Sequence, residues 1–181
     1  MAEEEKKHFV SGDKFYIQGE IRESLCKEIT APLITLIETK KKEKAPTPIE
    51  IYISSPGGSV DPTLDLIAQI ERARGLGVEI HTIVTANVAS AASLIAITGH
   101  KRFVSKRASH LIHYARMWQF TNNPEMLERE YEFGKWLQST LVDIYKEYTK
   151  MEDIETKIKT DNYRINGAED LIRLGLADEI I

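Results

Sequence analysis

A serine and a histidine that could act as nucleophile and base lie 23 residues apart, at Ser90 and His113. Upstream of them, the strand-like run 49–55 leads into a glycine pair, Gly57 and Gly58, whose backbone N–H groups could act as donors. A nucleophile, a base and a turn of backbone donors in one short chain favour acyl-transfer chemistry, above all peptide hydrolysis.

Ser90 stands at an expected strand-to-helix junction, and its neighbours from 86 to 92 are mostly small. Small neighbours let a substrate backbone approach the hydroxyl, and the free N–H groups of a helix start favour a developing oxyanion. The N–H of Ala91 would be one oxyanion-hole donor and that of Gly58 the second, because glycine has no side chain to block the approach. The same residues also fit a helix-capping serine in a tight packing site. Ser93, one turn further on, is expected to be a packing residue.

His113 is the expected general base, although a lone histidine in an apolar segment is also typical of a core or surface residue. His110 lies three residues earlier and would point the opposite way only in a flat strand, so spacing does not choose between the two histidines. Asp161, just before the segment Tyr163–Asn166, is the candidate for the carboxylate that orients the histidine. Taken alone, it would be a surface aspartate.

Length and composition predict one globular domain over residues 1–181, with 42% hydrophobic and 29% charged residues and a net charge of -4 that gives no reason to expect nucleic acid. The acidic start is unlike a signal peptide, and the best apolar run, 88–97, is far short of a membrane span of about 20 residues. The single cysteine, Cys26, fits a reducing compartment, so a cytoplasmic protein is expected. The five histidines are scattered, and we expect neither a metal nor another cofactor.

Strand-like and helix-like segments alternate along the chain, which predicts an α/β fold with a largely parallel sheet. Pro32 is expected to kink or break the first helix. A long helix is expected to open with Asn123 as N-cap and Pro124 at its first position, and the last helix with Asn166 and Glu169 in a capping-box arrangement. The expected strands are 15–17, 49–53, 78–84, 102–104 and 110–113, and the expected helices are 22–42, 61–74, 90–98, 123–148 and 166–175.

Five short motifs follow one another between residues 55 and 178. They are Ser55-Pro56-Gly57-Gly58, Ala89-Ser90, Gly99-His100-Lys101-Arg102-Phe103, Ile112-His113 and Gly175-Leu176-Ala177-Asp178. This ordered set resembles the Clp protease proteolytic subunit family, whose members have S-P-G-G, A-S, G-x-K-R-F, I-H and G-L-x-D elements in the same order. More broadly, it resembles the ClpP/crotonase superfamily.

The resemblance implies a ClpP-like fold of repeated β-β-α units, with a largely parallel sheet and a protruding handle helix in the region of about 114–150. It implies a serine endopeptidase that hydrolyses peptides or unfolded proteins within seven-subunit rings, stacked in pairs around an enclosed chamber. The implied roles are Ser90 as nucleophile, His113 as general base, Asp161 as orienting acid, and the N–H groups of Gly58 and Ala91 as the oxyanion hole.

Several positions differ from the family pattern. The usual glycines around the nucleophile are replaced at 86–88 and at Ala92. Asp161 matches only if two additional residues precede the last helix; without them Tyr163 takes its place. In the family, an axial loop and a first helix meet an ATP-dependent unfoldase. Residues 1–14 are too few to form both parts, which makes such an unfoldase a doubtful partner. A catalytically weak or inactive ring subunit, or acyl-CoA chemistry of the crotonase type, are the alternatives.

Overall fold

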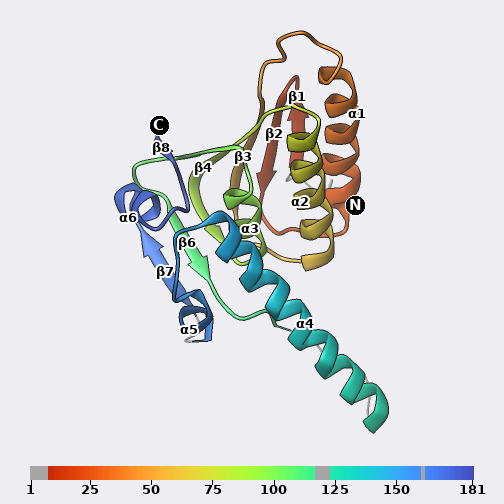
Figure 1. The fold of residues 1–181 in the computed structure, drawn as a ribbon, viewed down its shortest axis with the longest axis vertical. Coiled ribbons are helices and arrows are strands. Elements are labelled where there is room, and N and C mark those ends of the chain that lie inside the picture. The colour runs from red at the N-terminus through yellow and green to blue at the C-terminus, as the bar shows by residue number, and fades with distance from the viewer. Residues whose placement is uncertain (1–7, 117–122, 160–161) are drawn as a thin grey trace, which may run out of the picture.

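A computed structural model of the chain describes residues 8–116, 123–159 and 162–181. Figure 1 shows a body in which helices pack against a sheet, and one long helix, α4, that extends away from it. Within these ranges the strands are β1 (His8–Ser11), β2 (Lys14–Gln18), β3 (Ile49–Ser55), β4 (Ile80–Ala89), β5 (Lys101–Val104), β6 (Ser109–Ile112), β7 (Tyr163–Asn166) and β8 (Glu179–Ile180). The helices are the π-helix η1 (Cys26–Thr30), α1 (Ala31–Lys40), α2 (Val60–Gly75), α3 (Ala91–Ile97), α4 (Pro124–Tyr148), α5 (Ile154–Lys159) and α6 (Ala168–Arg173).

The sheet is largely parallel, which confirms the expected α/β class. Its main path runs β1-β2-β3-β4-β5-β8, and only the β1–β2 pair on this path is antiparallel among the described strands. The last residues of β4 leave β5 and pair with β6, Asn87 opposite Ser109 and Ala89 opposite Leu111. β6 then pairs antiparallel with β7. This second branch brings β6 beside the carboxyl end of β4, where Ser90 follows.

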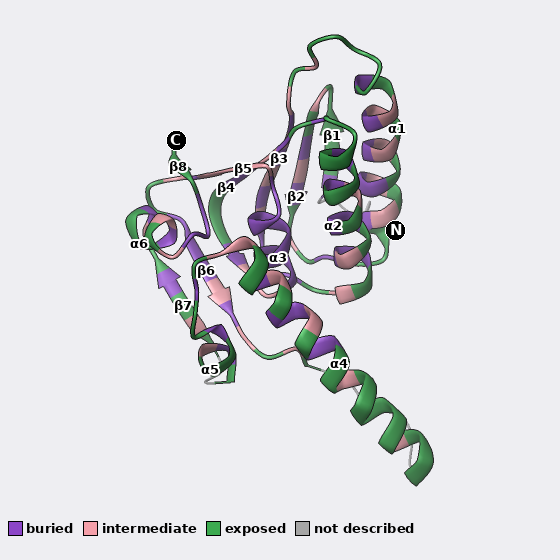
Figure 2. Cartoon of the chain, viewed as in Figure 1, coloured by how far each residue is buried: buried purple, intermediate pink, exposed green. Residues whose placement is uncertain are grey.

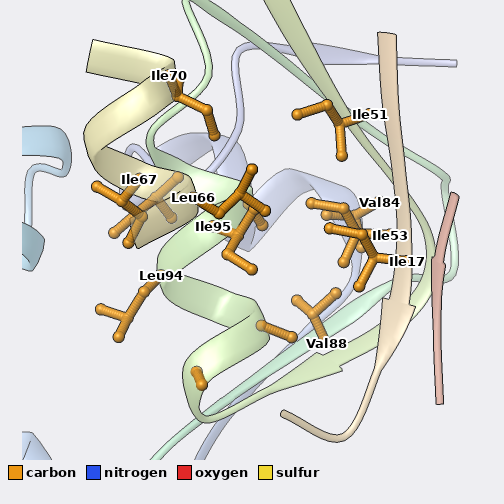
Figure 3. Close-up of a cluster of buried hydrophobic side chains, with 14 of the residues drawn as sticks. Ile17, Ile51, Ile53, Leu66, Ile67, Ile70, Val84, Val88, Leu94 and Ile95 are labelled. Atoms are coloured by element: carbon orange, nitrogen blue, oxygen red, sulfur yellow. The ribbon is translucent and has the colours of Figure 1, made fainter. Parts of the chain in front are cut away.

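One face of the sheet is covered by helices, and the alternation along β3 shows which face it is. Ile49, Ile51 and Ile53 are fully buried, while Glu50 and Tyr52 between them are partly exposed. Burial of each such apolar side chain contributes about 1.5–3 kcal/mol. Figure 3 shows the resulting core, in which side chains of the helices meet those of the strands: Leu66, Ile67 and Ile70 from α2, Leu94 and Ile95 from α3, and Ile17, Ile51, Ile53, Val84 and Val88 from the sheet.

The helix does not break at Pro32 as expected; instead its hydrogen-bond pattern changes just before this residue. The π-helix η1 ends at Thr30, and α1 continues directly with Pro32 in its first turn. Proline has no N–H to donate, and inside an α-helix its ring clashes with the carbonyl four residues earlier. At the first turn of α1 the missing N–H costs nothing, because the N–H groups there have no partner within that helix in any case.

Other predicted boundaries were wrong. Asn166 does not cap the last helix with Glu169; it ends β7, where it pairs with Ser109 of β6, and the N-cap of α6 is Gly167 with φ of 87°. Strand pairing across the molecule therefore prevails over the local capping pattern. β1 lies within the segment 1–14, ahead of the expected first strand, and β4 continues beyond the expected end of its strand. β7 and α5 had not been expected as elements.

α4 begins where predicted, since the side chain of Asn123 accepts hydrogen bonds from the N–H groups of Glu125 and Met126. Its inner half packs on the body and its outer half is exposed, as Figure 2 shows. No helix of the described ranges is both long enough and apolar enough to cross a membrane. The buried residues of the inner half include Leu137, Leu141, Val142 and Tyr145, and the exposed residues of the outer half include Met126, Tyr131, Phe133 and Trp136.

Candidate active site

Ser90 occupies a strained turn between β4 and α3, with φ of 55° and ψ of -130°. Residues other than glycine rarely adopt positive φ; of the described ones, only Asn162 also does. Such a conformation costs about 1–3 kcal/mol and persists only where the surrounding structure enforces it. The Ser90 side chain makes no capping hydrogen bond to α3. A helix-capping role therefore does not account for this serine.

Hydrogen bonds on both sides hold the Ser90 backbone in place. Its N–H donates to the carbonyl of Leu111 in β6 at 2.8 Å, and its carbonyl accepts from the N–H of Ser93 in α3 at 2.9 Å. The hydroxyl of Ser90 thus projects from a backbone that is fixed between a strand and a helix. Preorganisation of this kind is what a nucleophile requires.

The glycine turn after β3 packs directly against this backbone. The N–H of Ile21 donates to the carbonyl of Gly57 at 2.8 Å, and Gly57 and Gly58 have φ of 89° and 149°. A Cβ added to Gly57 would lie 2.5 Å from the carbonyl oxygen of Ala89 and 2.8 Å from the Cβ of Ser90. One added to Gly58 would lie 2.1 Å from the Ile21 carbonyl oxygen. Only glycine fits either position.

Gly58, Ser90, Ala91 and His113 line one cavity of about 350 Å³. Ala91 is the first residue of α3, so its N–H has no acceptor inside the helix. The N–H of Gly58 donates to no group within the described part of the chain. Two uncommitted backbone donors therefore belong to residues that border the same cavity as the Ser90 hydroxyl. Much of the remaining wall is apolar and includes Val60, Leu94, Leu141, Tyr145 and Ile158.

His113 follows β6 and is half-buried. Its Nδ1 lies 2.6 Å from the carbonyl oxygen of Tyr114, which can only accept, so Nδ1 carries the proton. In the neutral ring Nε2 is then unprotonated and can accept a proton. No hydrogen bond joins His113 to Ser90 in the structure as described here. The base and the nucleophile share a cavity without being in contact through a hydrogen bond.

Asp161, the predicted orienting acid, lies outside the described residues. Tyr163, the other residue that the alignment could place there, opens β7 opposite Ile112, and the Lys157 ammonium lies 5.0 Å from its ring centroid. Asn162 borders a second cavity of about 580 Å³ together with His113. The chain just after Asp161 therefore comes close to the histidine. The acceptor that His113 does have, a backbone carbonyl, could not be foreseen from residue types.

The structure also separates the two histidines that spacing could not. His110 is fully buried, and its Nδ1 lies 2.9 Å from the Oγ of Ser93, which is fully buried as well. Burial lowers the pKa of His110 to about 3, so the ring is neutral. Ser93, expected to be a packing residue, is thus the polar partner of a buried histidine. No sequence signal indicated this pair.

Away from the cavity, two of the five ordered motifs, 99–103 and 175–178, contact each other. The Asp178 carboxylate accepts from the backbone N–H and the guanidinium of Arg102 at 2.6–3.0 Å, and Arg102 also donates to the carbonyls of Tyr148 and Gly175. Burial favours a higher pKa of the Asp178 carboxyl, but the hydrogen bonds with Arg102 outweigh burial and lower it. This contact is structural. Across the described residues, no group of histidine, cysteine and carboxylate side chains is suited to hold a metal ion.

A mostly parallel α/β fold with a strained serine, a histidine and free backbone donors around one cavity defines a candidate serine-hydrolase site. The family model of Clp protease matches residues 4–181, and the chain belongs to the Clp protease family. This result confirms the resemblance seen in the ordered motifs.

Curated relatives agree with this assignment. The chain is 35% identical over 99 residues to the ATP-dependent Clp protease proteolytic subunit of Leuconostoc citreum, covering 54% of this chain and 46% of the relative. It is 35% identical over 107 residues to the ATP-dependent Clp protease proteolytic subunit 2 of Treponema denticola, covering 58% of this chain and 50% of the relative. The match thus spans about half the length of each of these relatives.

Proposed function

We propose that this protein is a serine-type endopeptidase that hydrolyses peptides or unfolded proteins in the cytoplasm. The observation that carries the proposal is the cavity bordered by Gly58, Ser90, Ala91 and His113, which come from three separate segments of the chain. The strained backbone of Ser90 supports it, because strain of this kind is concentrated at functional sites. The family match supports the same class of activity.

In the proposed mechanism the Ser90 Oγ attacks the scissile carbonyl carbon while Nε2 of His113 takes the hydroxyl proton. The carbonyl oxygen becomes an oxyanion, which the N–H groups of Gly58 and Ala91 would stabilise by about 3 kcal/mol each. The tetrahedral intermediate collapses, the C–N bond breaks, and the leaving amine takes the proton from His113. Water then attacks the acyl-enzyme with the same base, which releases the acid and regenerates Ser90.

Two residues, Asp161 and Tyr163, are candidates for the position that orients the His113 ring. In the proposed triad the Asp161 carboxylate replaces the Tyr114 carbonyl as the acceptor of the Nδ1–H of His113. We expect Asp161→Asn to lower kcat by about 10⁴ and Tyr163→Phe to leave kcat nearly unchanged. The reverse result would assign the position to Tyr163 and reject the alignment with two additional residues.

Self-association is the second component of the proposal. The exposed aromatic side chains of the outer half of α4 include Tyr131, Phe133 and Trp136, and the last two stack with ring centroids 5.7 Å apart. Clusters of exposed apolar side chains mark interaction sites. We propose that this half of α4 joins two seven-subunit rings around a closed chamber. Analytical ultracentrifugation tests the assembly, and a monomer at micromolar concentration would reject it.

One observation favours a second candidate, a catalytically weak or inactive ring subunit. Ser90 and His113 share a cavity, but no hydrogen bond between them is present among the described residues. In that case the protein would form the same assembly without an activated serine. Catalytic hydrogen bonds often tighten only when substrate binds, so the active enzyme remains the first candidate.

Labelling by a fluorophosphonate probe, which reacts with activated serines, separates the two candidates. We expect the purified wild type to be labelled and to hydrolyse an unfolded protein. Ser90→Ala and His113→Ala should lose labelling, and their hydrolysis should fall by about 10⁴ or more. Ser105→Ala, which removes a hydroxyl bound to the Thr85 carbonyl, is the matched control and should be labelled normally. An intact oligomer without labelling would instead support the inactive subunit.

A further inference from the structure

The buried hydrogen bond between Ser93 and His110 joins the two elements that carry the proposed nucleophile and base. Ser93 lies in α3, three residues after Ser90, and His110 lies in β6, three residues before His113. Both side chains have no exposed surface, and Oγ and Nδ1 are 2.9 Å apart. The bond therefore ties the helix that begins after the nucleophile to the strand that ends just before the base.

A second bond ties the same two segments at the adjacent strand position. The N–H of Ser90 donates to the carbonyl of Leu111, the residue after His110. Ser90 and His113 have no direct hydrogen bond in the described structure, so their separation depends on how α3 sits on β6. Two bonds to consecutive residues of β6 fix that placement more closely than apolar packing alone, which is non-directional.

The surroundings of the pair extend to the cavity. Tyr145 of α4 borders the cavity together with Ser90, and its side chain is almost fully buried. Burial raises the pKa of the Tyr145 phenol, and the nearby Ser93 hydroxyl opposes that rise. Both α4 and β6 pack against α3, and the Ser93 hydroxyl bonds to β6 through His110. It lies where the three elements that surround the proposed nucleophile meet.

Burial of these polar groups has an energetic cost. The Nε2 atom of His110 is buried, and within the described structure it has no hydrogen-bond partner. An unsatisfied buried polar group costs about 1–3 kcal/mol. His110 pairs with Val88 on β4 and with Ile165 on β7, so its strand neighbours are apolar. An apolar side chain would avoid this cost at the same place, so stability alone does not explain a histidine here.

We propose that Ser93 and His110 are positioning residues whose buried hydrogen bond sets the separation between Ser90 and His113. This inference rests on the proposed serine-peptidase function. In this proposal neither Ser93 nor His110 touches the substrate. The bond acts through the placement of α3 on β6, and its effect is expected on the chemical step rather than on substrate binding.

The double variant Ser93→Ala/His110→Leu tests this role, because replacing both partners by apolar groups removes the bond without leaving either partner unpaired. The matched control is Thr82→Val. This substitution removes another fully buried hydroxyl, which donates to the Ala96 carbonyl of α3 at 2.7 Å. Unlike the Ser93 hydroxyl, it does not bond to β6. The readouts are kcat, KM, the rate of fluorophosphonate labelling and the melting temperature.

For the double variant we expect kcat and the labelling rate to fall about tenfold, since small displacements of reacting groups have effects of this size or larger. KM should stay within about twofold, and the melting temperature should be unchanged or higher. Thr82→Val should keep the wild-type kcat at a lower melting temperature. A double variant with wild-type kcat would overturn the proposal and leave the pair a packing feature.

The outcome stays distinguishable from a failure of the proposed function. If the wild type is neither labelled nor active, that function fails, and crystal structures of the wild type and the double variant then decide the positioning role. A longer or more variable separation between Ser90 Oγ and the His113 ring in the variant supports it. An unchanged separation overturns it.

Discussion

The molecule contains two serine–histidine pairs made from the same two segments, and they differ in almost every physical respect. Ser93 and His110 lie in the core, fully buried and 2.9 Å apart. Ser90 and His113 lie at the wall of a cavity, with no hydrogen bond to each other in the described structure. The pair that is joined by a hydrogen bond is therefore the pair that no substrate can reach. We call Ser93 and His110 the inner pair, and Ser90 and His113 the outer pair.

This difference shows why residue types alone do not identify a nucleophile and a base. A buried histidine with a low pKa next to a buried hydroxyl has no path for a substrate, whatever its geometry. Ser90 instead combines an accessible hydroxyl with a strained backbone and nearby uncommitted donors. An accessible hydroxyl, a strained backbone and uncommitted donors together distinguish the candidate site. In our proposal the hydrogen bond between Ser93 and His110 positions its two side chains.

The largest effect is expected from Gly57→Ala, which should displace Ser90 and leave the hydrogen bond between Ser93 and His110 in place. The new Cβ would meet the Ala89 carbonyl oxygen at 2.5 Å and the Ser90 Cβ at 2.8 Å, at a φ of 89°. We expect a loss of about 3 kcal/mol in unfolding free energy and loss of probe labelling. Gly77→Ala is the control, because its φ is 72° but nothing lies within 4 Å, and it should cost about 1 kcal/mol. Equal losses in urea unfolding would contradict the clash.

The next effect concerns the inner pair and pH. In the folded protein His110 stays neutral down to about pH 3, whereas a histidine in the unfolded chain binds a proton below about pH 6.5. Between these values the unfolded state binds more protons, so stability falls as pH falls, with a slope of up to about 1.4 kcal/mol per pH unit. The Ser93→Ala/His110→Leu variant should lose this part of the slope, and Ser93→Ala should keep it. Urea unfolding between pH 4 and 7 measures both, and identical slopes would show that His110 is not the source.

A smaller effect separates the two serines by backbone conformation. Ser90→Gly removes the strain of a positive φ, so it should be about 1 kcal/mol more stable than Ser90→Ala, although both variants are expected to be inactive. At Ser93, inside α3, the order should reverse, because glycine in a helix is about 1 kcal/mol less favourable than alanine. Thermal unfolding measures both orders. If alanine is more stable than glycine at position 90 as well as at position 93, the result argues against strain at Ser90.

The smallest effect on stability is expected far from both pairs. The side chain of Trp136, on the outer half of α4, is 57% exposed. Trp136→Ala should change the unfolding free energy of the chain by less than about 0.5 kcal/mol, while it should weaken the proposed self-association. Leu141→Ala, on the buried inner half, is the contrast and should cost about 2–5 kcal/mol. Sedimentation and unfolding measured together separate the two roles, and unchanged sedimentation of Trp136→Ala would place the assembly surface elsewhere.

Local patterns predicted the fold well where one segment decides its own structure. Alternation of isoleucines placed β3, and Asn123 with Pro124 placed the start of α4. Prediction failed where a distant partner decides, as at Asn166, which pairs with Ser109 in a sheet instead of capping a helix. The π-helix before Pro32 is only five residues long, which is too short for a hydrophobic pattern to reveal its period.

By itself the sequence determined the α/β class, the family through its ordered motifs, and Ser90, His113, Gly58 and Ala91 as the candidate site. The class follows from periodicity, and the family and the choice of site residues follow from the resemblance that the ordered motifs carry; all of these are properties of the chain alone. Only the tertiary structure decided that His110 turns inward to Ser93 while His113 faces the cavity, that Ser90 is strained, and that Gly57 lies against it. The physical reason is that burial, backbone strain and the approach of separate segments arise only when β4, α3 and β6 pack together.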